Sequence, residues 1–359
     1  MTKNYLLILL LLLSSITYLS CSEDADDNYE NITPVQVDLT QVPFEKLSDY
    51  NFFDGDLKNQ TPALGVLPYS PISSLFTDYA SKKRFVWMPK NTKATYNGAG
   101  EILELPVGSA IIKTFYYDNV QPNNTTKIIE TRIMIKKATG WIFAEYVWNE
   151  EQTDAYLNMN GSTTTIDWIK NGVPITINYR IPSEAECFIC HKENNVAVPI
   201  GIKPQSLNAT YTYATGSMNQ LQKWINVGYL ENNLPSNITT VVDYSDTSQN
   251  LELRVRSYLD INCAHCHKEG SHCDYRPIRL AFDETATPSN LGICIAPEEN
   301  INSALTNIIT PNNFNRSVIH FRMNTTDEAT RMPLIGRNLI HTEGVQLIED
   351  WINTLTPCN

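Results

Sequence analysis

Two short stretches of this chain have the form Cys-x-x-Cys-His, at residues 187–191 and 263–267. Two thiols three positions apart can each form a thioether to one vinyl group of the same haem, and the histidine that follows is then placed to bind the iron. We therefore expect two covalently attached haem c groups. The attachment sites are Cys187, Cys190, Cys263 and Cys266, and the proximal iron ligands are His191 and His267.

The cysteine pairs have two other interpretations. A single Cys-x-x-Cys can be a redox disulfide, and two of them can bind zinc. Zinc ribbons usually place their two pairs about 15–20 residues apart. Here the pairs lie far apart along the chain, and each is followed at once by a histidine. A thioredoxin-like site would occur once, within a βαβ pattern. Haem remains the leading interpretation and zinc the main alternative.

Length and charge narrow the possible functions. The chain has 359 residues, which is enough for two or three domains. Its formal net charge is −12. This acidity argues against a nucleic-acid partner and is compatible with a basic redox partner protein.

The N-terminus has the pattern of a bacterial targeting segment. Lys3 is followed by an apolar run at residues 6–13, which is too short to span a membrane. Leu19-Ser20-Cys21 resembles the end of a lipobox, so we expect a signal peptide at 1–20, a lipid on Cys21 and an acidic tether at 21–41. An ordinary secretory signal is the alternative. Either interpretation predicts an extracytoplasmic protein, and the lipid would anchor it to a bacterial membrane, in the periplasm or at the outer-membrane surface.

Residues 42–182 are predicted to form an antiparallel β-rich domain. β-Branched and aromatic residues dominate several runs, and Asn171-Gly172 between the last two is a hairpin signal. This domain contains no cysteine and no histidine, so it supplies no proximal haem ligand. The strands are expected at 84–88, 109–117, 131–136, 141–148, 163–168 and 175–180.

Two haem modules are predicted to follow. The first, at 183–235, is short, with one helix near 218–229. The second, at 236–359, has apolar stripes that predict helices near 251–261, 315–323 and 342–355. A helix before the haem motif and a helix at the end are the outline of a class I cytochrome c. The expected fold class is therefore multidomain α+β, with the β-rich domain followed by two mainly α-helical cytochrome c-like haem modules.

A methionine thioether commonly fills the second axial position of haem iron. Met332, in a loop before Pro333, is the candidate for the second haem, with Met323 as the runner-up. The first haem has no clear partner. Met218 is the candidate and Met88 another option, and an iron left open there could bind peroxide.

Three cysteines remain after haem and lipid attachment. In an exported protein two of them are expected to pair. Cys273 and Cys294 would close the loop after the second motif, and Cys358 is either the unpaired one or the replacement for Cys273.

Several stretches together resemble a known family, the bacterial diheme c-type cytochrome lipoproteins with a β-rich N-terminal region. The resemblance covers about residues 45–357, and it is carried by YVWNEEQTD at 146–154, YRIPSEAECFICH at 179–191 and YLDINCAHCH at 258–267. It implies haem binding and electron transfer, and it implies little about the donor or the acceptor.

The leading functional hypothesis is a diheme c-type cytochrome in extracytoplasmic electron transfer, because no acid–base or nucleophile constellation stands beside the motifs. One alternative is a diheme peroxidase-like oxidoreductase in which the first haem is catalytic. A second alternative is a surface binding protein whose β-domain recognises a partner.

Overall fold

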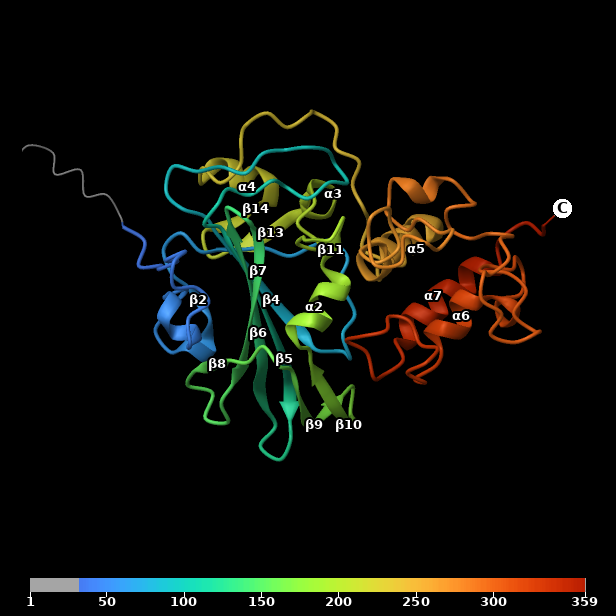
Figure 1. The fold of residues 1–359 in the computed structure, drawn as a ribbon, viewed down its shortest axis with the longest axis horizontal. Coiled ribbons are helices and arrows are strands. Elements are labelled where there is room, and N and C mark those ends of the chain that lie inside the picture. Colours follow the sequence, from blue (N-terminus) through green and yellow to red (C-terminus); the bar gives the residue numbers. More distant parts are fainter. Residues whose placement is uncertain (1–31, 359) are drawn as a thin grey trace, which may run out of the picture. The chain divides into compact units, whose positions relative to one another are not determined.

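The longest strands of the chain form one antiparallel sheet (Figure 1). The computed structural model describes residues 32–358. Within the sheet the order is β10-β9-β5-β6-β7-β8, with β4 also paired to β5 and β3 paired to β4. The strands are β3 (Leu67–Pro68), β4 (Ser81–Trp87), β5 (Ala110–Val120), β6 (Thr125–Lys137), β7 (Gly140–Trp148), β8 (Ala155–Leu157), β9 (Ser162–Lys170) and β10 (Val173–Ile181).

Strand β5 organises this sheet. One of its edges pairs with β6 along most of its length. Its other edge is shared, since β4 pairs with residues from Ala110 to Tyr116, and β9 meets β5 at Val120. All six strands expected from the sequence are present, and Asn171-Gly172 lies in the turn between β9 and β10. The runs of β-branched and aromatic residues therefore located the sheet correctly.

The remaining elements are short. The small strands are β1 (Phe53–Asp54), β2 (Thr61–Pro62), β11 (Lys192–Glu193), β12 (Val196–Ala197), β13 (Thr210–Tyr213) and β14 (Gly216–Asn219). The helices are α2 (Glu184–Cys190), α3 (Pro204–Leu207), α4 (Gln220–Asn226), α5 (Leu251–Leu259), α6 (Val318–Met323) and α7 (Thr342–Ile352). Single turns are η1 (Leu47–Tyr50), η2 (Leu57–Asn59), the π-helical η3 (Asp260–Ala264), η4 (Glu284–Ala286) and η5 (Phe314–Arg316).

The expected fold class is wrong, because the structure contains no pair of helical cytochrome modules. Within the described part of the chain, strands make up 27% of the residues and helices 19%, and this helical share includes the single turns as well as six short α-helices. The predicted first haem module has no core of its own. Leu221 and Trp224 of α4 pack in one cluster with Ile111 and Met134 of the sheet. The apolar stripe of a helix can be buried against any apolar surface. The stripe of α4 is buried against the sheet, so it did not require a separate helical module.

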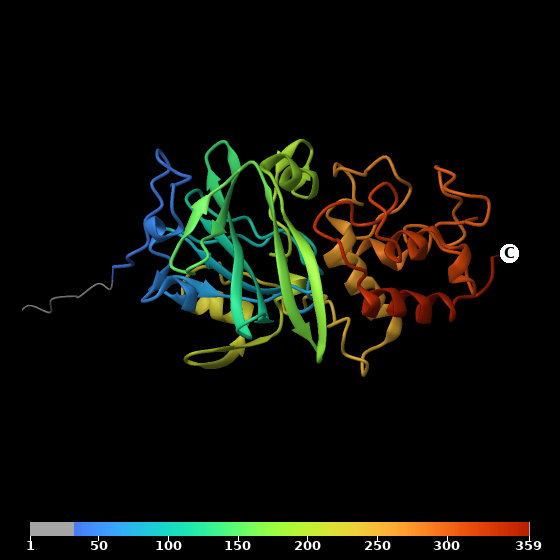
Figure 2. The ribbon, with the colours of Figure 1, turned by 90° about the horizontal axis from the view of Figure 1, so that it is seen from below.

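The C-terminal residues do have a core, but little of the chain there is helical. Helix α7 packs against α5, and Trp351 and Ile352 are buried in a cluster with Val255 and Leu259. Between α5 and α6 the chain is mostly loops and single turns. Figure 2 shows this part beside the β9–β10 hairpin, where Lys170 forms an ion pair with Glu343 at 3.0 Å.

Residues 34–359 form one compact unit. None of the helices within 32–358 is long and apolar enough to cross a membrane. The predicted signal peptide and Cys21 lie outside the described residues.

Candidate functional site

The first motif begins directly after the sheet ends. Strand β10 stops at Ile181, and Ser183 caps α2 with a capping box, in which the Glu186 carboxylate accepts from the Ser183 backbone N–H at 2.7 Å. Arg180 Nη2 lies 2.6 Å from the same carboxylate. Because this cap fixes where α2 begins, Cys187 and Cys190 lie three residues apart on one face of the helix. His191 is the residue that ends the helix.

The His191 ring is held in one tautomer. Its Nδ1 lies 2.9 Å from the carbonyl oxygen of Val198, which can only accept, so Nδ1 donates and Nε2 keeps a free lone pair. Burial lowers the pKa of His191 to about 4, which makes the ring neutral at pH 7. A neutral imidazole with one N–H on a backbone carbonyl is the usual arrangement of a metal-ligating histidine.

The second motif sits on irregular backbone. Helix α5 passes into η3, which carries Cys263, and His267 N–H donates to the Cys263 carbonyl at 3.1 Å. Such π-helical turns inside helices are frequent at functional sites. Burial lowers the pKa of His267 to about 4. Nδ1 of His267 is buried and has no hydrogen-bond partner among the described residues.

Each motif lines its own cavity. The first cavity holds about 1280 Å³ of empty space, counting the part open to solvent, and Cys187, Cys190 and His191 line it. The second holds about 1010 Å³, and Cys263 and His267 line it. Both cavities are lined mainly by apolar and aromatic side chains, which suits an organic ligand better than a single ion. Each motif therefore faces its own largely apolar cavity.

Met332 is brought to the second cavity, as expected, and lines it together with His267. Met323 lines the same cavity and is 7% exposed. The loop that begins at Met332 separates the two cavities. Met332 lines the second cavity, Ile335 and Gly336 line the first, and Pro333 lines both.

Met218 is not brought to either cavity. It lies on β14 with 36% of its surface exposed, and its Sδ accepts from Asn226 Nδ2 at 3.4 Å. The prediction that it ligates the first iron is therefore wrong in geometry. Met88 is buried in the core beside the sheet and lines neither cavity.

Two other methionines, Met134 and Met159, do line the first cavity. Met134 shares a strand and a face with Arg132, which alternation in β6 could have indicated. Met159 lies after β8, and nothing in the sequence singled it out.

The two motifs meet through their second cysteines. The Sγ atoms of Cys190 and Cys266 and a ring nitrogen of His265 all lie within 4.8 Å of one another. Hydrogen bonding to Cys266 lowers the pKa of the Cys190 thiol, and that same contact raises the pKa of Cys266. Three ligand atoms are one fewer than the four of a structural zinc site. A closed zinc site here would need a fourth ligand, which no cysteine, histidine or carboxylate among residues 32–358 supplies at this distance.

The disulfide joins Cys294 to Cys358. The first expected pairing, Cys273–Cys294, is therefore wrong, and the alternative in which Cys358 replaces Cys273 is confirmed. Cys273 is a buried free thiol, and its N–H donates to the carbonyl of Cys266 behind the second motif. This backbone contact keeps Cys273 with the motif, while Cys294 lies next to the C-terminal end.

No protein-family model matches the chain, and no curated protein or solved structure matches it either.

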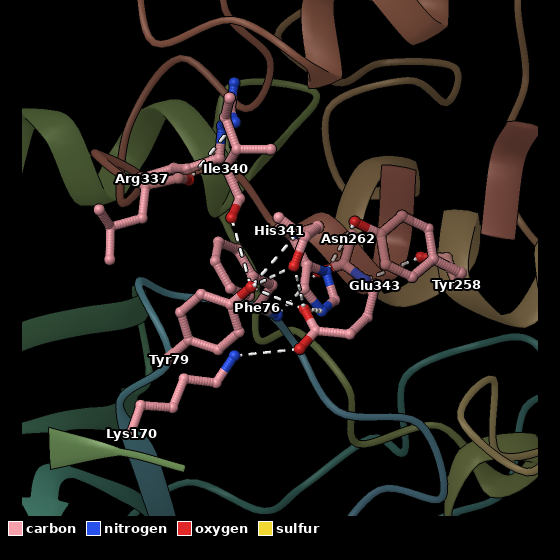
Figure 3. A network of polar contacts seen from close by, with 11 residues as sticks. Phe76, Tyr79, Lys170, Tyr258, Asn262, Arg337, Ile340, His341 and Glu343 are labelled. Atoms are coloured by element: carbon pink, nitrogen blue, oxygen red, sulfur yellow. Dashed lines mark hydrogen bonds and ion pairs between the residues drawn. The ribbon is translucent and has the colours of Figure 1, made fainter. Parts of the chain in front are cut away.

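The two parts of the chain that build these cavities are joined by a polar and aromatic network around His341 (Figure 3). The rings of Phe76 and His341 stack with centroids 4.2 Å apart, and Tyr258 Oη lies 3.1 Å from His341 Nδ1. Asn262, just before Cys263, accepts from the Phe76 backbone at 2.8 Å. The second motif is thus fixed against the segment that leads into β4.

Proposed function

We propose that this chain is a diheme c-type cytochrome that transfers electrons outside the cytoplasm. The observation that carries the proposal is that each Cys-x-x-Cys-His motif lines a separate cavity. Cys187, Cys190 and His191 line the first, and Cys263 and His267 line the second, with Cys266 in a smaller adjoining pocket. When bound, haem supplies a one-electron iron couple. The protein contributes attachment, orientation and exclusion of water.

The residues of the first cavity suit this role. Cys187 and Cys190 would bind the haem covalently, and His191 would ligate the iron through the Nε2 that its contact with Val198 leaves free. The thioethers of Met134 and Met159 line the same cavity, which favours a ligated site over an open catalytic one.

In the second cavity Cys263 and Cys266 would attach the haem, and His267 and Met332 would be its axial ligands. Support comes from the shared cavity of Met332 and His267. A methionine ligand is soft and favours the reduced iron, so we expect ligation by Met332 to raise the potential of the second site.

The surroundings of the protein are part of the same proposal. A lipid on Cys21 would hold it at a bacterial membrane, and the net charge of −12 suits a basic redox partner. The resemblance to bacterial diheme cytochrome lipoproteins points in the same direction.

The test is covalent haem content. The full chain is expressed with a c-type maturation system, and intact mass and acid–acetone extraction are measured. We expect two haems in the parent, one in Cys187→Ala/Cys190→Ala, one in Cys263→Ala/Cys266→Ala and none when all four are replaced. Cys273→Ser is the control and keeps both haems. Extraction of all haem from the parent would overturn the proposal.

A further inference from the structure

Four charged residues form a straight row across the sheet inside the first cavity. Arg84 on β4 pairs with Lys113 on β5, Lys113 pairs with Arg132 on β6, and Arg132 pairs with Glu145 on β7. Directly paired residues of neighbouring strands point to the same face. All four line the cavity that also contains the first motif.

The row contains more positive charge than the protein neutralises. Arg132 has two carboxylate partners, Glu130 and, at 3.1 Å, Glu145. Arg84 is 8% exposed, and within residues 32–358 no carboxylate pairs with its guanidinium or with Lys113, whose Nζ lies 4.8 Å from the centroid of the Phe115 ring. Burial lowers the pKa of both groups, and an anionic partner in the cavity would favour their charged forms.

The neighbouring row of the same face is apolar. Ile111 pairs with Met134 and Met134 with Phe143, and all three line the cavity. The Phe143 ring lies 5.6 Å from the His191 ring. The cavity therefore has an apolar wall near the iron-binding histidine and a cationic row about two residues, or roughly 7 Å, further along the strands. Such a wall fits an apolar body that carries carboxylates at one end.

We propose that Arg84 and Lys113 bind the carboxylates of the first haem, with Arg132 held beside them by Glu130 and Glu145. This inference rests on the proposed function, because haem is the ligand whose chemistry it assigns. The row would then fix which edge of the group faces the sheet, in addition to the covalent bonds of Cys187 and Cys190.

The inference has an electrostatic consequence that can be measured. A positive charge near an iron site favours its reduced form, because reduction removes one positive charge from the iron. Loss of Arg84 or Lys113 should therefore lower the midpoint potential of the first haem and leave that of the second in place.

The experiment uses the full chain with its haems. Midpoint potentials are measured by optical redox titration for the parent, Arg84→Gln and Lys113→Met. The control is Lys83→Gln, which also removes one positive charge from β4. Lys83 points to the opposite face and donates to the Asn59 carbonyl at 3.3 Å. The titration wave that accompanies the Met332 near-infrared band is assigned to the second haem.

We expect the first-haem potential to fall in Arg84→Gln and in Lys113→Met, and to stay at the parental value in Lys83→Gln. Equal shifts in all three variants, or no shift in the first two, would overturn the inference. If Arg84→Gln yields no folded protein, Arg84→Lys should keep the potential near that of the parent, and a fall there equal to that of Lys113→Met counts against it.

Two further measurements separate the possible causes. Haem content by intact mass distinguishes the proposals, since absence of covalent haem rejects the proposed function, whereas two haems with unmoved potentials reject only the cationic row. Titration with inorganic phosphate tests whether the row binds a free anion. A first-haem potential that depends on phosphate would overturn the assignment to haem carboxylates, and independence supports it.

Discussion

The Tyr79 hydroxyl donates a hydrogen bond to Glu343 Oε2 at 2.6 Å, across 264 positions of the chain (Figure 3). Lys170 of the β9–β10 hairpin binds the other oxygen of the same carboxylate at 3.0 Å. Glu343 lies in the first turn of α7, where the helix dipole also stabilises a negative charge. One carboxylate thus joins the sheet to the C-terminal helix α7.

We expect Tyr79→Phe to lower the free energy of unfolding by about 1 kcal/mol, because it removes a hydrogen bond to a charged group at a partly exposed position. Urea unfolding of the holoprotein measures it. Tyr156→Phe removes a hydroxyl from an exposed tyrosine and serves as the control. An equal loss in both variants would mean that the contact with Glu343 does not stabilise the fold.

Stability should fall when the pH is lowered from about 6.5 to 4. Burial lowers the pKa of His341 to about 4, and the nearby Glu343 opposes that shift. The unfolded chain binds a proton near the ordinary histidine value of about 6.5, so it holds more protons than the folded state in this window. The stability is therefore complete above pH 6.5 and is lost progressively as the pH falls.

The expected loss from His341 is roughly 2–3 kcal/mol across that window. Urea unfolding at pH 7.5 and at pH 4.5 measures it in the holoprotein, where iron ligation removes His191 and His267 from the titration. His341→Gln should reduce the difference between the two pH values. A variant with the full parental difference would show that another group is responsible.

Met332→Ala should abolish the near-infrared band that the second haem contributes as a methionine-ligated ferric haem, because the sulfur that lines the second cavity is removed. Met218→Ala, which removes a methionine remote from both cavities, should leave the spectrum unchanged and is the matched control. Retention of the band in Met332→Ala would reject Met332 as the ligand, and Met134 and Met159 would be tested next.

The Cys294–Cys358 disulfide closes a loop with a sequence separation of 64. Its removal in Cys294→Ser/Cys358→Ser should cost about 2–4 kcal/mol, chiefly by freeing the unfolded chain. A reductant should lower the unfolding midpoint of the parent and have no effect on the double variant. If reductant affects both equally, a different thiol is involved.

The sheet could be predicted from the sequence because its signal is local. Each long strand is a run of β-branched and aromatic residues, and the turn between β9 and β10 is an Asn-Gly pair. The two motifs and Met332 were equally readable, since their chemistry depends on residue type and spacing.

The features that the sequence did not predict depend on contacts between segments that are distant along the chain. The apolar stripe of α4 was interpreted as part of a helical module, although Trp224 packs on the sheet. Arg84, Lys113, Arg132 and Glu145 form a row only because of the strand register, which no single strand specifies. The partner of Cys294 was set by where the C-terminus lies.

The loop between Met332 and Gly336 has one side in each cavity, and Pro333 belongs to both. We therefore expect a change of ligation at Met332 to shift Pro333 in the wall of the first cavity, and a ligand in the first cavity to act on the loop that holds Met332. Coupling of this kind is reciprocal: whatever free energy one site adds to the other, it receives back in equal amount. We therefore expect the occupancy of one cavity to change the affinity of the other cavity for its ligand.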